Sequence, residues 1–445
     1  MDDDPPDGGA AIPTAIPKGR WRRLGKLGKL GAKAAGSAVL GKAGHKLLAT
    51  TLAKELGQMK GLPMKFGQLL SYMDGLVPEE QQDLYAQTLA VLRANAPAVD
   101  NAACLRVLDE QLGHSRHDVF DVFDDQPLAS ASIGQVYAAE RDGQRLCVKV
   151  QYPGIADATA ADLQNVDVLM GVAKRLVPNF DMAPLIDNFE ARMQEEFDYR
   201  REAAYQQRFA DLYVDDADIV VPGVVGELSS DLVLTSHRLD GVTFETFLAE
   251  ASADDRDHLG QTLFRFAFGS LLVHDVFHAD PHPGNLLLRC GGPRRLGVLD
   301  YGCVQPFDAQ QTEALAGLVR AACANAELTP HVKSAFAVDG DDESVALLSE
   351  IVGMVLSPIS APQPFTFSRD FAKTISKRVV DAKLKLQMRL LTRKARLQWD
   401  DGALGFIART LFGLAGLWGQ LQAQGDFQQL TLGMLEQRQA VSNAG

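Results

Sequence analysis

The sequence of 445 residues contains few cysteines, few aromatic residues and no long apolar run. Its five cysteines include no C-x-x-C pair, and their odd number leaves at least one thiol unpaired. This pattern argues against a disulfide framework and a zinc knuckle, and it favours a reducing cytoplasm. No segment offers the roughly 20 consecutive apolar residues of a membrane span. The cysteines are Cys104, Cys147, Cys290, Cys303 and Cys323.

Two segments come nearest to membrane-targeting elements, and both differ from them in composition. Leu404 to Leu421 is apolar but carries Arg409 and several glycines, so we expect a buried or interfacial helix. Residues 1–17 are acidic and then rich in Pro and Gly, without the apolar core of a signal peptide, and they predict a disordered tail. We therefore expect a cytoplasmic protein, with the inner face of a membrane as a peripheral location.

The charge of the chain is unevenly distributed. The formal net charge is −13, yet residues 18–60 contain eleven Lys or Arg and a single acid, Glu55. Trp21 lies among arginines, and Leu24, Leu27 and Leu30 recur at every third residue. This segment predicts a basic, partly amphipathic arm that binds an anionic membrane surface; a solvated linker is the alternative. Nucleic acid is a poor partner, because the rest of the chain is acidic and has few aromatic side chains for stacking.

The periodicity of apolar residues divides the remainder into three parts. Residues 61–115 predict a helical extension. Residues 116–240 predict a small lobe, with a hairpin that turns at Asp142-Gly143, a long helical insertion, and two more strands around a turn between residues 218 and 241. Residues 241–445 predict a larger and mainly helical lobe. The expected fold class is therefore α+β.

A loop of small residues enters the predicted hairpin, and Lys149 lies on its second strand. Small residues let backbone N–H groups approach phosphates, and a strand lysine can reach the α- and β-phosphates of a nucleotide. Taken alone, the loop is also compatible with an ordinary hairpin and a solvated lysine. The candidate loop consists of Ala129, Ser130, Ala131, Ser132, Ile133, Gly134, Gln135 and Val136.

A glutamate-rich segment, "MQEEFDYRREA", supplies candidate partners for Lys149. On a helix, Glu196 or Glu202 could pair with the lysine and hold it toward phosphate. The alternative is a solvated face with pairs four residues apart, such as Glu196 and Arg200.

The stretch "VFHADPHPGNLLLR" and the later "VLDYG" place Asp280, Asn285 and Asp300 beside apolar runs. In H-x-D-x-x-x-x-N, the Asp positions or deprotonates a hydroxyl group, and the Asn joins the Asp of D-x-G as a ligand of Mg²⁺. Hard oxygen ligands with one or two carboxylates suit magnesium.

A zinc site is the rival interpretation, because three histidines recur at every fourth residue from His274 to His282. Pro281 and Pro283 argue against the continuous helix that such a site would need, and no H-E-x-x-H motif is present.

The order of these parts is that of a bilobal, protein-kinase-like phosphotransferase. From about residue 55 to residue 330, the sequence resembles the UbiB family of atypical kinases, also called the AarF or ABC-one family. The resemblance rests on "KFGQ" (Lys65 to Gln68), "ASASIGQV", "EFDYRREA", "FHADPHPGN" and "DYG". It implies a kinase-like fold with a helical N-terminal extension that carries the K-x-G-Q motif, and it implies support of coenzyme Q biosynthesis.

The resemblance also implies residue roles. Lys149 would bind ATP, Asp280 would be the catalytic aspartate, and Asn285 and Asp300 would hold Mg²⁺. Lys65 and Gln68 would lie over the site where a peptide otherwise docks, which favours ATP hydrolysis or work on a small molecule such as an isoprenoid lipid or quinone precursor. Two rivals remain: a small-molecule kinase of the aminoglycoside-phosphotransferase type, and a nucleotide-sensing protein without turnover.

Overall fold

The fold is known from a computed structural model. It describes residues 100–131, 133–163, 194–289, 291–292, 294–336, 339–372, 374–375, 378, 382, 395–396 and 403–444. The acidic tail, the basic arm, the K-x-G-Q motif with Lys65 and Gln68, and Ser132 lie outside these residues. The described residues form two compact units: a small unit (100–163 and 225–236) and a large unit (194–224 and 237–444).

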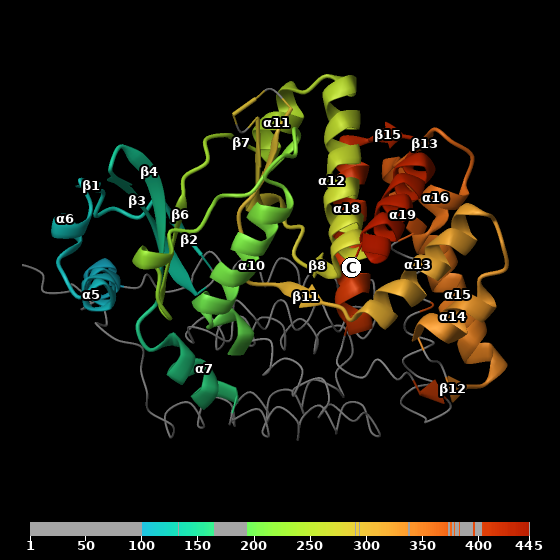
Figure 1. The fold of residues 1–445 in the computed structure, drawn as a ribbon, viewed down its shortest axis with the longest axis horizontal. Helices are drawn as coiled ribbons and strands as arrows, with labels where there is room; N and C mark the ends of the chain where they lie inside the picture. Colours follow the sequence, from blue (N-terminus) through green and yellow to red (C-terminus); the bar gives the residue numbers. More distant parts are fainter. Residues whose placement is uncertain are drawn as a thin grey trace, which may run out of the picture. The chain divides into compact units, whose positions relative to one another are not determined.

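The small unit is built on one antiparallel sheet with the strand order β1-β3-β4-β6, and β2 pairs with β3 (Figure 1). Its strands are β1 (Val122–Phe123), β2 (Ala129–Ser130), β3 (Gly134–Arg141), β4 (Gln144–Gln151) and β6 (Val233–His237). Its helices are α5 (Asn101–Leu112), α6 (Arg116–Val119) and α7 (Ile155–Leu163).

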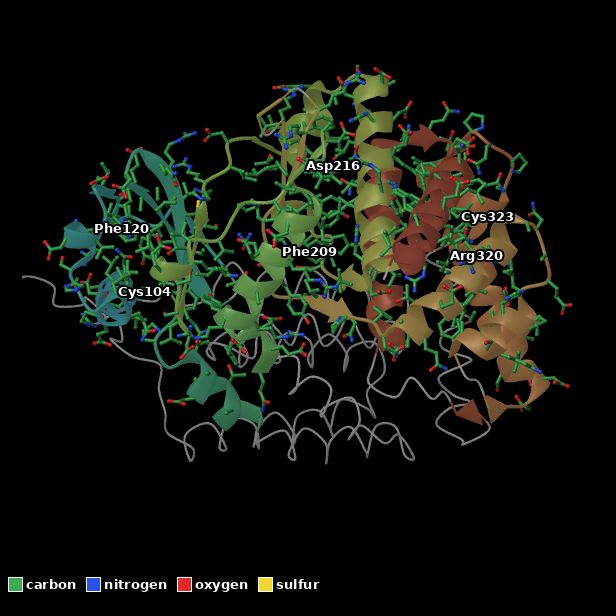
Figure 2. The ribbon with its side chains drawn as sticks, viewed as in Figure 1. Cys104, Phe120, Phe209, Asp216, Arg320 and Cys323 are labelled. Carbon is green, nitrogen blue, oxygen red and sulfur yellow. The ribbon has the colours of Figure 1, made fainter. Side chains whose placement is uncertain are left out.

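The predicted hairpin is confirmed as β3 and β4. Asp142 and Gly143 form the two-residue turn with φ of 53° and 71°, so both are in the left-handed region that Asp-Gly turns favour. Alternate residues of the hairpin, among them Tyr137 and Val148, are buried beneath α5. Cys104 and Phe120, labelled in Figure 2, belong to the same core.

The large unit is mainly helical. Its helices are α10 (Tyr199–Leu212), α11 (Phe244–Glu250), α12 (Ala253–His274), α13 (Ala309–Cys323), α14 (Thr329–Phe336), α15 (Asp342–Val355), α16 (Ser357–Ser360), α18 (Ala403–Leu421) and α19 (Phe427–Ala444). Short strands connect them: β5 (Ile219–Val220), β7 (Val242–Thr243), β8 (Val276–His278), β9 (Leu286–Leu288), β10 (Leu296–Val298), β11 (Val304–Pro306), β12 (Asp339–Gly340), β13 (Phe365–Thr366), β14 (Ala395–Arg396) and β15 (Gln424–Gly425). Two 3-10 turns are η1 (Gly226–Leu228) in the small unit and η2 (Pro283–Asn285) in the large unit.

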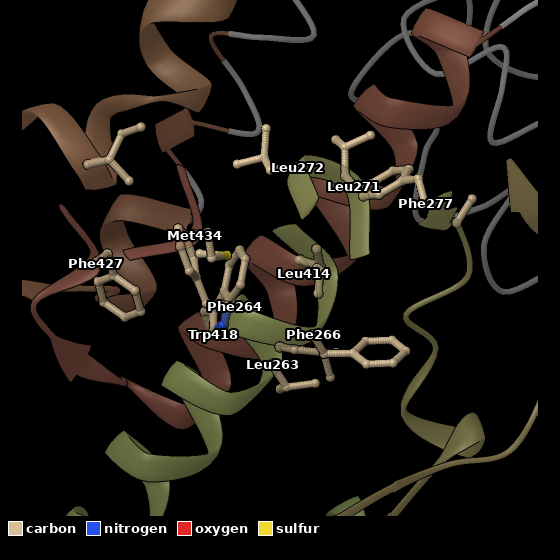
Figure 3. Close-up of a cluster of buried hydrophobic side chains, with 14 of the residues drawn as sticks. Leu263, Phe264, Phe266, Leu271, Leu272, Phe277, Leu414, Trp418, Phe427 and Met434 are labelled. Carbon is tan, nitrogen blue, oxygen red and sulfur yellow. The ribbon is translucent and has the colours of Figure 1, made fainter. Parts of the chain in front are cut away.

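Helix α12 is the central support of the large unit. A reciprocal capping box between Ser252 and Asp255 starts it, and Asp275 ends it in the left-handed conformation with φ 56°. Its buried side pairs with α18 and α19, where Phe264 packs on Trp418 and Phe427 (Figure 3). The apolar residues of α12 therefore fix the position of the chain that follows Asp275.

Two expectations about strands need correction. The strands predicted between residues 218 and 241 exist, but they do not pair around a turn: β5 runs parallel to β10, and β6 joins β4. Periodicity identifies a strand but not its partner, and the intervening 3-10 turn η1 carries the chain from one sheet to the other. In addition, Val276–His278 and Val304–Pro306 pair as short strands β8 and β11 within the part predicted to be almost entirely helical.

The apolar segment Leu404 to Leu421 forms most of α18. From Leu414 onward it contributes fully buried residues to the core of the large unit, which confirms the expectation of a buried helix for this part. None of the helices within the described ranges is long and apolar enough to cross a membrane.

Candidate functional site

The small-residue loop of the small unit forms a tight turn between β2 and β3. The backbone N–H of Ala131 donates to the carbonyl oxygen of Gly134 across the turn (2.9 Å). Ala129 and Ser130 are exposed, whereas the side chain of Ile133 is buried and anchors the turn. The loop thus exposes a backbone edge of the kind that can approach a phosphate.

The two faces of β3 separate the last residues of this loop. Gln135 is buried and accepts a hydrogen bond from the hydroxyl of Tyr137 (2.6 Å), so its side chain faces the core. Val136 faces the opposite side and lies directly across from Lys149 of β4. Lys149 is half-buried, while its neighbour Val148 is fully buried in the core. The sheet therefore places Lys149 beside the end of the loop, on the face away from the core.

The candidate glutamates occupy different positions in the large unit. Asp198 caps α10 by accepting a hydrogen bond from the backbone N–H of Arg201 (2.9 Å), so Glu196 lies before the helix and is half-buried. Glu202 lies in the first turn of α10 and is only 4% exposed. The solvated-face interpretation therefore fails for Glu202, because a carboxylate is buried only where other groups compensate its lost hydration.

Glu202 lies close to the D-Y-G turn. A Cβ atom added to Gly302 would be 3.6 Å from Oε2 of Glu202 and 3.3 Å from Oδ1 of Asp300. The backbone N–H of Gly302 donates to Oδ1 of Asp300 (3.0 Å). Gly302 thus has two carboxylates around it, and carboxylates gathered in this way repel one another unless positive charge accompanies them.

A hydrogen bond joins the two ends of the catalytic-loop motif. Nδ2 of Asn285 donates to Oδ2 of Asp280 (2.9 Å), and the backbone N–H of His282 donates to the carbonyl oxygen of Asp280 (2.8 Å). Pro283 to Asn285 form the 3-10 turn η2, which His282 caps by accepting from the backbone N–H of Gly284 (3.0 Å). Because the amide nitrogen of Asn285 is used in this bond, its carbonyl oxygen is directed away from Asp280.

The β9–β10 hairpin brings Asn285 and Asp300 together. Leu286 pairs with Val298, so Asn285 immediately precedes one strand at the same end where Asp300 follows the other. The backbone N–H of Leu299 donates to the carbonyl oxygen of Asn285 (3.0 Å) and closes this end. Residues 15 apart in sequence are therefore adjacent because of strand pairing.

His278, at the end of β8, fixes the backbone of the D-Y-G turn. Its Nε2 lies 2.6 Å from the carbonyl oxygen of Asp300, and β8 pairs with β11 on the far side of the turn. The ring lies among Phe209, Phe266 and Tyr301. Burial lowers the pKa of His278, which favours the neutral ring, and a neutral ring with its proton on Nε2 donates to Asp300.

The donors gathered here fit magnesium better than zinc. An amide oxygen and a carboxylate are hard ligands, and Glu202 adds negative charge nearby. The three histidines of the zinc interpretation lie on different elements: His274 ends α12, His278 contacts Asp300, and His282 caps η2. Among the described residues, no group of three or more His, Cys, Asp or Glu could hold a metal ion.

Two contacts from α18 to the catalytic loop were not predicted from the sequence. The hydroxyl of Thr410 donates to the carbonyl oxygen of Ala279 (3.1 Å). A Cβ atom on Gly413 would lie 3.0 Å from Cγ of Pro281, so only glycine fits there without displacement. Both partners are more than 130 residues apart, and no local motif marks Thr410 or Gly413.

Comparisons with known proteins give matches of one kind. The model of the ABC1 atypical kinase-like domain matches residues 91–329. The chloroplastic protein ACTIVITY OF BC1 COMPLEX KINASE 8 of Arabidopsis thaliana is 32% identical over 61% of this chain and 36% of its own length. The mitochondrial atypical kinase COQ8 of Saccharomyces cerevisiae is 31% identical over 58% of this chain and 50% of its own length. The chain thus spans half or less of these two curated relatives.

A solved structure extends the match over most of the chain. The Rv3197–erythromycin complex from Mycobacterium tuberculosis is 30% identical, covers 89% of this chain and 96% of its own, and superposes with a TM-score of 0.59. The expected α+β, kinase-like fold is thereby confirmed. The family resemblance is confirmed as well: the chain belongs to the ABC1 atypical kinase-like family, the UbiB family of atypical kinases.

Proposed function

We propose that the protein is a Mg-ATP-dependent ATPase or phosphotransferase that acts on an isoprenoid lipid or quinone precursor at a membrane surface. The observation that carries the proposal is the convergence of Asp280, Asn285 and Asp300 at one end of the β9–β10 hairpin. A protein that only sensed nucleotide would need the two metal ligands but not the aspartate that accepts a proton from a hydroxyl group.

In this proposal Asn285 and Asp300 hold Mg²⁺ through an amide oxygen and a carboxylate oxygen. The metal neutralises phosphate charge when bound. Asp280, restrained by Asn285, orients the attacking hydroxyl and takes its proton. The loop from Ala129 to Val136 and Lys149 bind the phosphates of ATP. We favour Glu202 over Glu196 as the carboxylate that serves this site, since Glu202 is buried beside Gly302.

The test follows the γ-phosphate. The purified full-length chain is incubated with Mg²⁺ and γ-labelled ATP, alone and with farnesol, a phenol or kanamycin as acceptor. Release of phosphate or label on farnesol or the phenol supports the proposal. Label on kanamycin supports the aminoglycoside-phosphotransferase type. Nucleotide binding without any product supports the sensing protein. An Asp215→Asn variant serves as control, since Asp215 is exposed and outside the site.

The proposed membrane contact is the basic arm, residues 18–60, whose role rests on its sequence. Each basic residue near an anionic leaflet contributes on the order of 1 kcal/mol, and salt screens this attraction. The full chain should co-sediment with anionic vesicles at low salt and far less at high salt. Deletion of residues 1–60 should remove most of this binding and leave ATP binding intact; binding that survives the deletion would place the contact elsewhere.

The solved relative supplies a second candidate function. Because Rv3197 was solved with erythromycin, we also propose that this chain binds a bulky, largely apolar small molecule. A rise in melting temperature with erythromycin would support this candidate, and unchanged melting at saturating erythromycin would rule out erythromycin as a ligand.

A further inference from the structure

The large unit contains an apolar cavity of about 60 Å³ that the proposed phosphate chemistry does not use. Its walls come from α12, α13, α15, α16, α18 and α19 and from the segment after β13. Aromatic rings form much of this wall: the ring of Trp418 lies 4.6 Å from that of Phe367 and is parallel to that of Phe268 at 6.4 Å. Figure 3 shows Trp418 beside Phe264, another lining residue.

The described lining offers almost no polar surface. Thr431 and Trp418 are the described lining side chains that can donate a hydrogen bond, and both are engaged. The hydroxyl of Thr431 donates to the carbonyl oxygen of Phe427 (2.7 Å). Nε1 of Trp418 donates to the carbonyl oxygen of Gly260 (2.9 Å). Water needs two or more polar partners to remain in a cavity, so this one favours an occupant without hydrogen-bonding groups.

The lining is not buried uniformly. Phe264, Phe367 and Trp418 are almost fully buried, whereas Ile351 and Val355, on one side of α15, are half-buried. The half-buried residues mark the side from which an apolar group can enter. The cavity is too small for a sugar or a fused ring system, but it can take the narrow end of a chain.

We propose that this cavity binds the end of a hydrocarbon chain, supplied by an isoprenoid or by a straight-chain lipid. Both sources present the same chemistry to the wall, which is methyl and methylene surface without polar atoms. The inference rests on the proposed function only where it names an isoprenoid as one source. Binding itself needs neither ATP nor magnesium, so the two proposals can fail separately.

The test uses the fluorescence of Trp418 in the full-length chain without nucleotide. The other two tryptophans are removed by Trp21→Phe and Trp399→Phe, so all emission comes from the cavity wall. Bromododecanol is titrated as the probe, because bromine quenches tryptophan on contact. We expect saturable quenching that dodecanol or farnesol reverses. Stronger displacement by farnesol identifies an isoprenoid source, and stronger displacement by dodecanol a straight-chain source.

Val355→Phe fills the entrance and should weaken binding of the probe by about tenfold or more, because added bulk in a packed site is not accommodated. Ile351→Phe makes the same change at a second position, in case one variant does not fold. The matched control is Val214→Phe, at a residue 73% exposed and outside the lining, which should bind like the parent. Quenching that does not saturate, or that folded Val355→Phe and Ile351→Phe leave unchanged, would overturn the proposal.

Discussion

The hydroxyl of Thr410 in α18 donates a hydrogen bond of 3.1 Å to the carbonyl oxygen of Ala279, the residue before Asp280. The bond is buried, and it joins residues 131 positions apart. Because Ala279 is also bound through its N–H to the carbonyl oxygen of Cys303 (2.9 Å), both backbone groups next to Asp280 are fixed. We infer that Thr410 is a positioning residue for the catalytic loop.

Thr410→Val should therefore lower kcat more than it changes KM for ATP, because it leaves the carbonyl oxygen of Ala279 without its partner. The loss of one buried hydrogen bond corresponds to about 1–3 kcal/mol. Thr410→Ser keeps the hydroxyl and should restore most of the rate. Steady-state kinetics of the three proteins provide the measurement. Equal kcat values for Thr410→Val and wild type would show that the bond has no positioning role.

Tyr301 of the D-Y-G turn predicts an unusual response to substitution. Its hydroxyl is buried and has no hydrogen-bond partner among the described residues, and burial raises its pKa well above the ordinary value. Removing an unsatisfied buried hydroxyl relieves a desolvation penalty, so Tyr301→Phe should raise stability by about 1–2 kcal/mol. Tyr137→Phe is the matched control, because that hydroxyl has two partners, Asn101 and Gln135.

The control variant should lower the melting temperature, while Tyr301→Phe should raise it. Thermal unfolding of both proteins, followed by circular dichroism, decides the question. A lower melting temperature for Tyr301→Phe would mean that the hydroxyl has a stabilising partner.

The ion pair between Asp216 and Arg265 predicts a pH dependence of stability. Burial tends to raise the pKa of the Asp216 carboxyl, but hydrogen bonds from Arg265 and from the backbone N–H groups of Asp218 and Ile219 outweigh it and leave that pKa below its ordinary value. Figure 2 shows Asp216 at the start of the segment that leads into β5. The carboxylate therefore links this segment to α12.

A folded-state pKa below the unfolded value means that the carboxylate stabilises the fold above the unfolded pKa of about 3.9. This contribution is lost as pH falls through that value and then through the lower folded pKa. Asp216→Asn should reduce stability at neutral pH by about 2 kcal/mol and flatten the acid limb of the stability curve. Urea midpoints measured from neutral pH down to about pH 4 test this. An unchanged acid limb in the variant would contradict the assignment.

The loop alanines predict a change in nucleotide preference. Ala131 closes the turn onto Gly134, and its Cβ limits how the backbone can wrap around phosphates. Ala131→Gly should therefore alter the ratio of ADP to ATP affinity and raise transfer of label to the protein itself. Ala138→Gly, in the middle of β3, is a control for a general effect of glycine. Unchanged affinities without new labelling of Ala131→Gly would refute this reading of the loop.

The sequence predicted those parts of the fold that local chemistry determines. Asp142 and Gly143 identify a hairpin turn because few residue pairs accept two positive φ angles. Apolar residues on either side then fix the register, and with it the position of Lys149 opposite Val136. The order of motifs was sufficient to place Asp280, Asn285 and Asp300 in one unit.

Long-range partners could not be predicted. Nothing near Ile219 indicates that it pairs with Leu296, and nothing near Thr410 indicates Ala279, because such contacts depend on how whole helices pack. The choice between Glu196 and Glu202 had the same origin. The burial of Glu202 depends on the D-Y-G turn about 100 residues later, and helical periodicity alone does not reveal it.

The central claim is that Asp300 holds the metal and Asp280 serves the reaction, and isothermal titration of ATP with and without Mg²⁺ tests it most directly. Asp300→Asn should lose Mg²⁺-dependent ATP binding, because it removes the carboxylate ligand of the metal. Asp280→Asn should bind Mg-ATP like wild type and lose turnover by about 100-fold or more. Normal Mg²⁺-dependent binding by Asp300→Asn, or normal turnover by Asp280→Asn, would contradict the account.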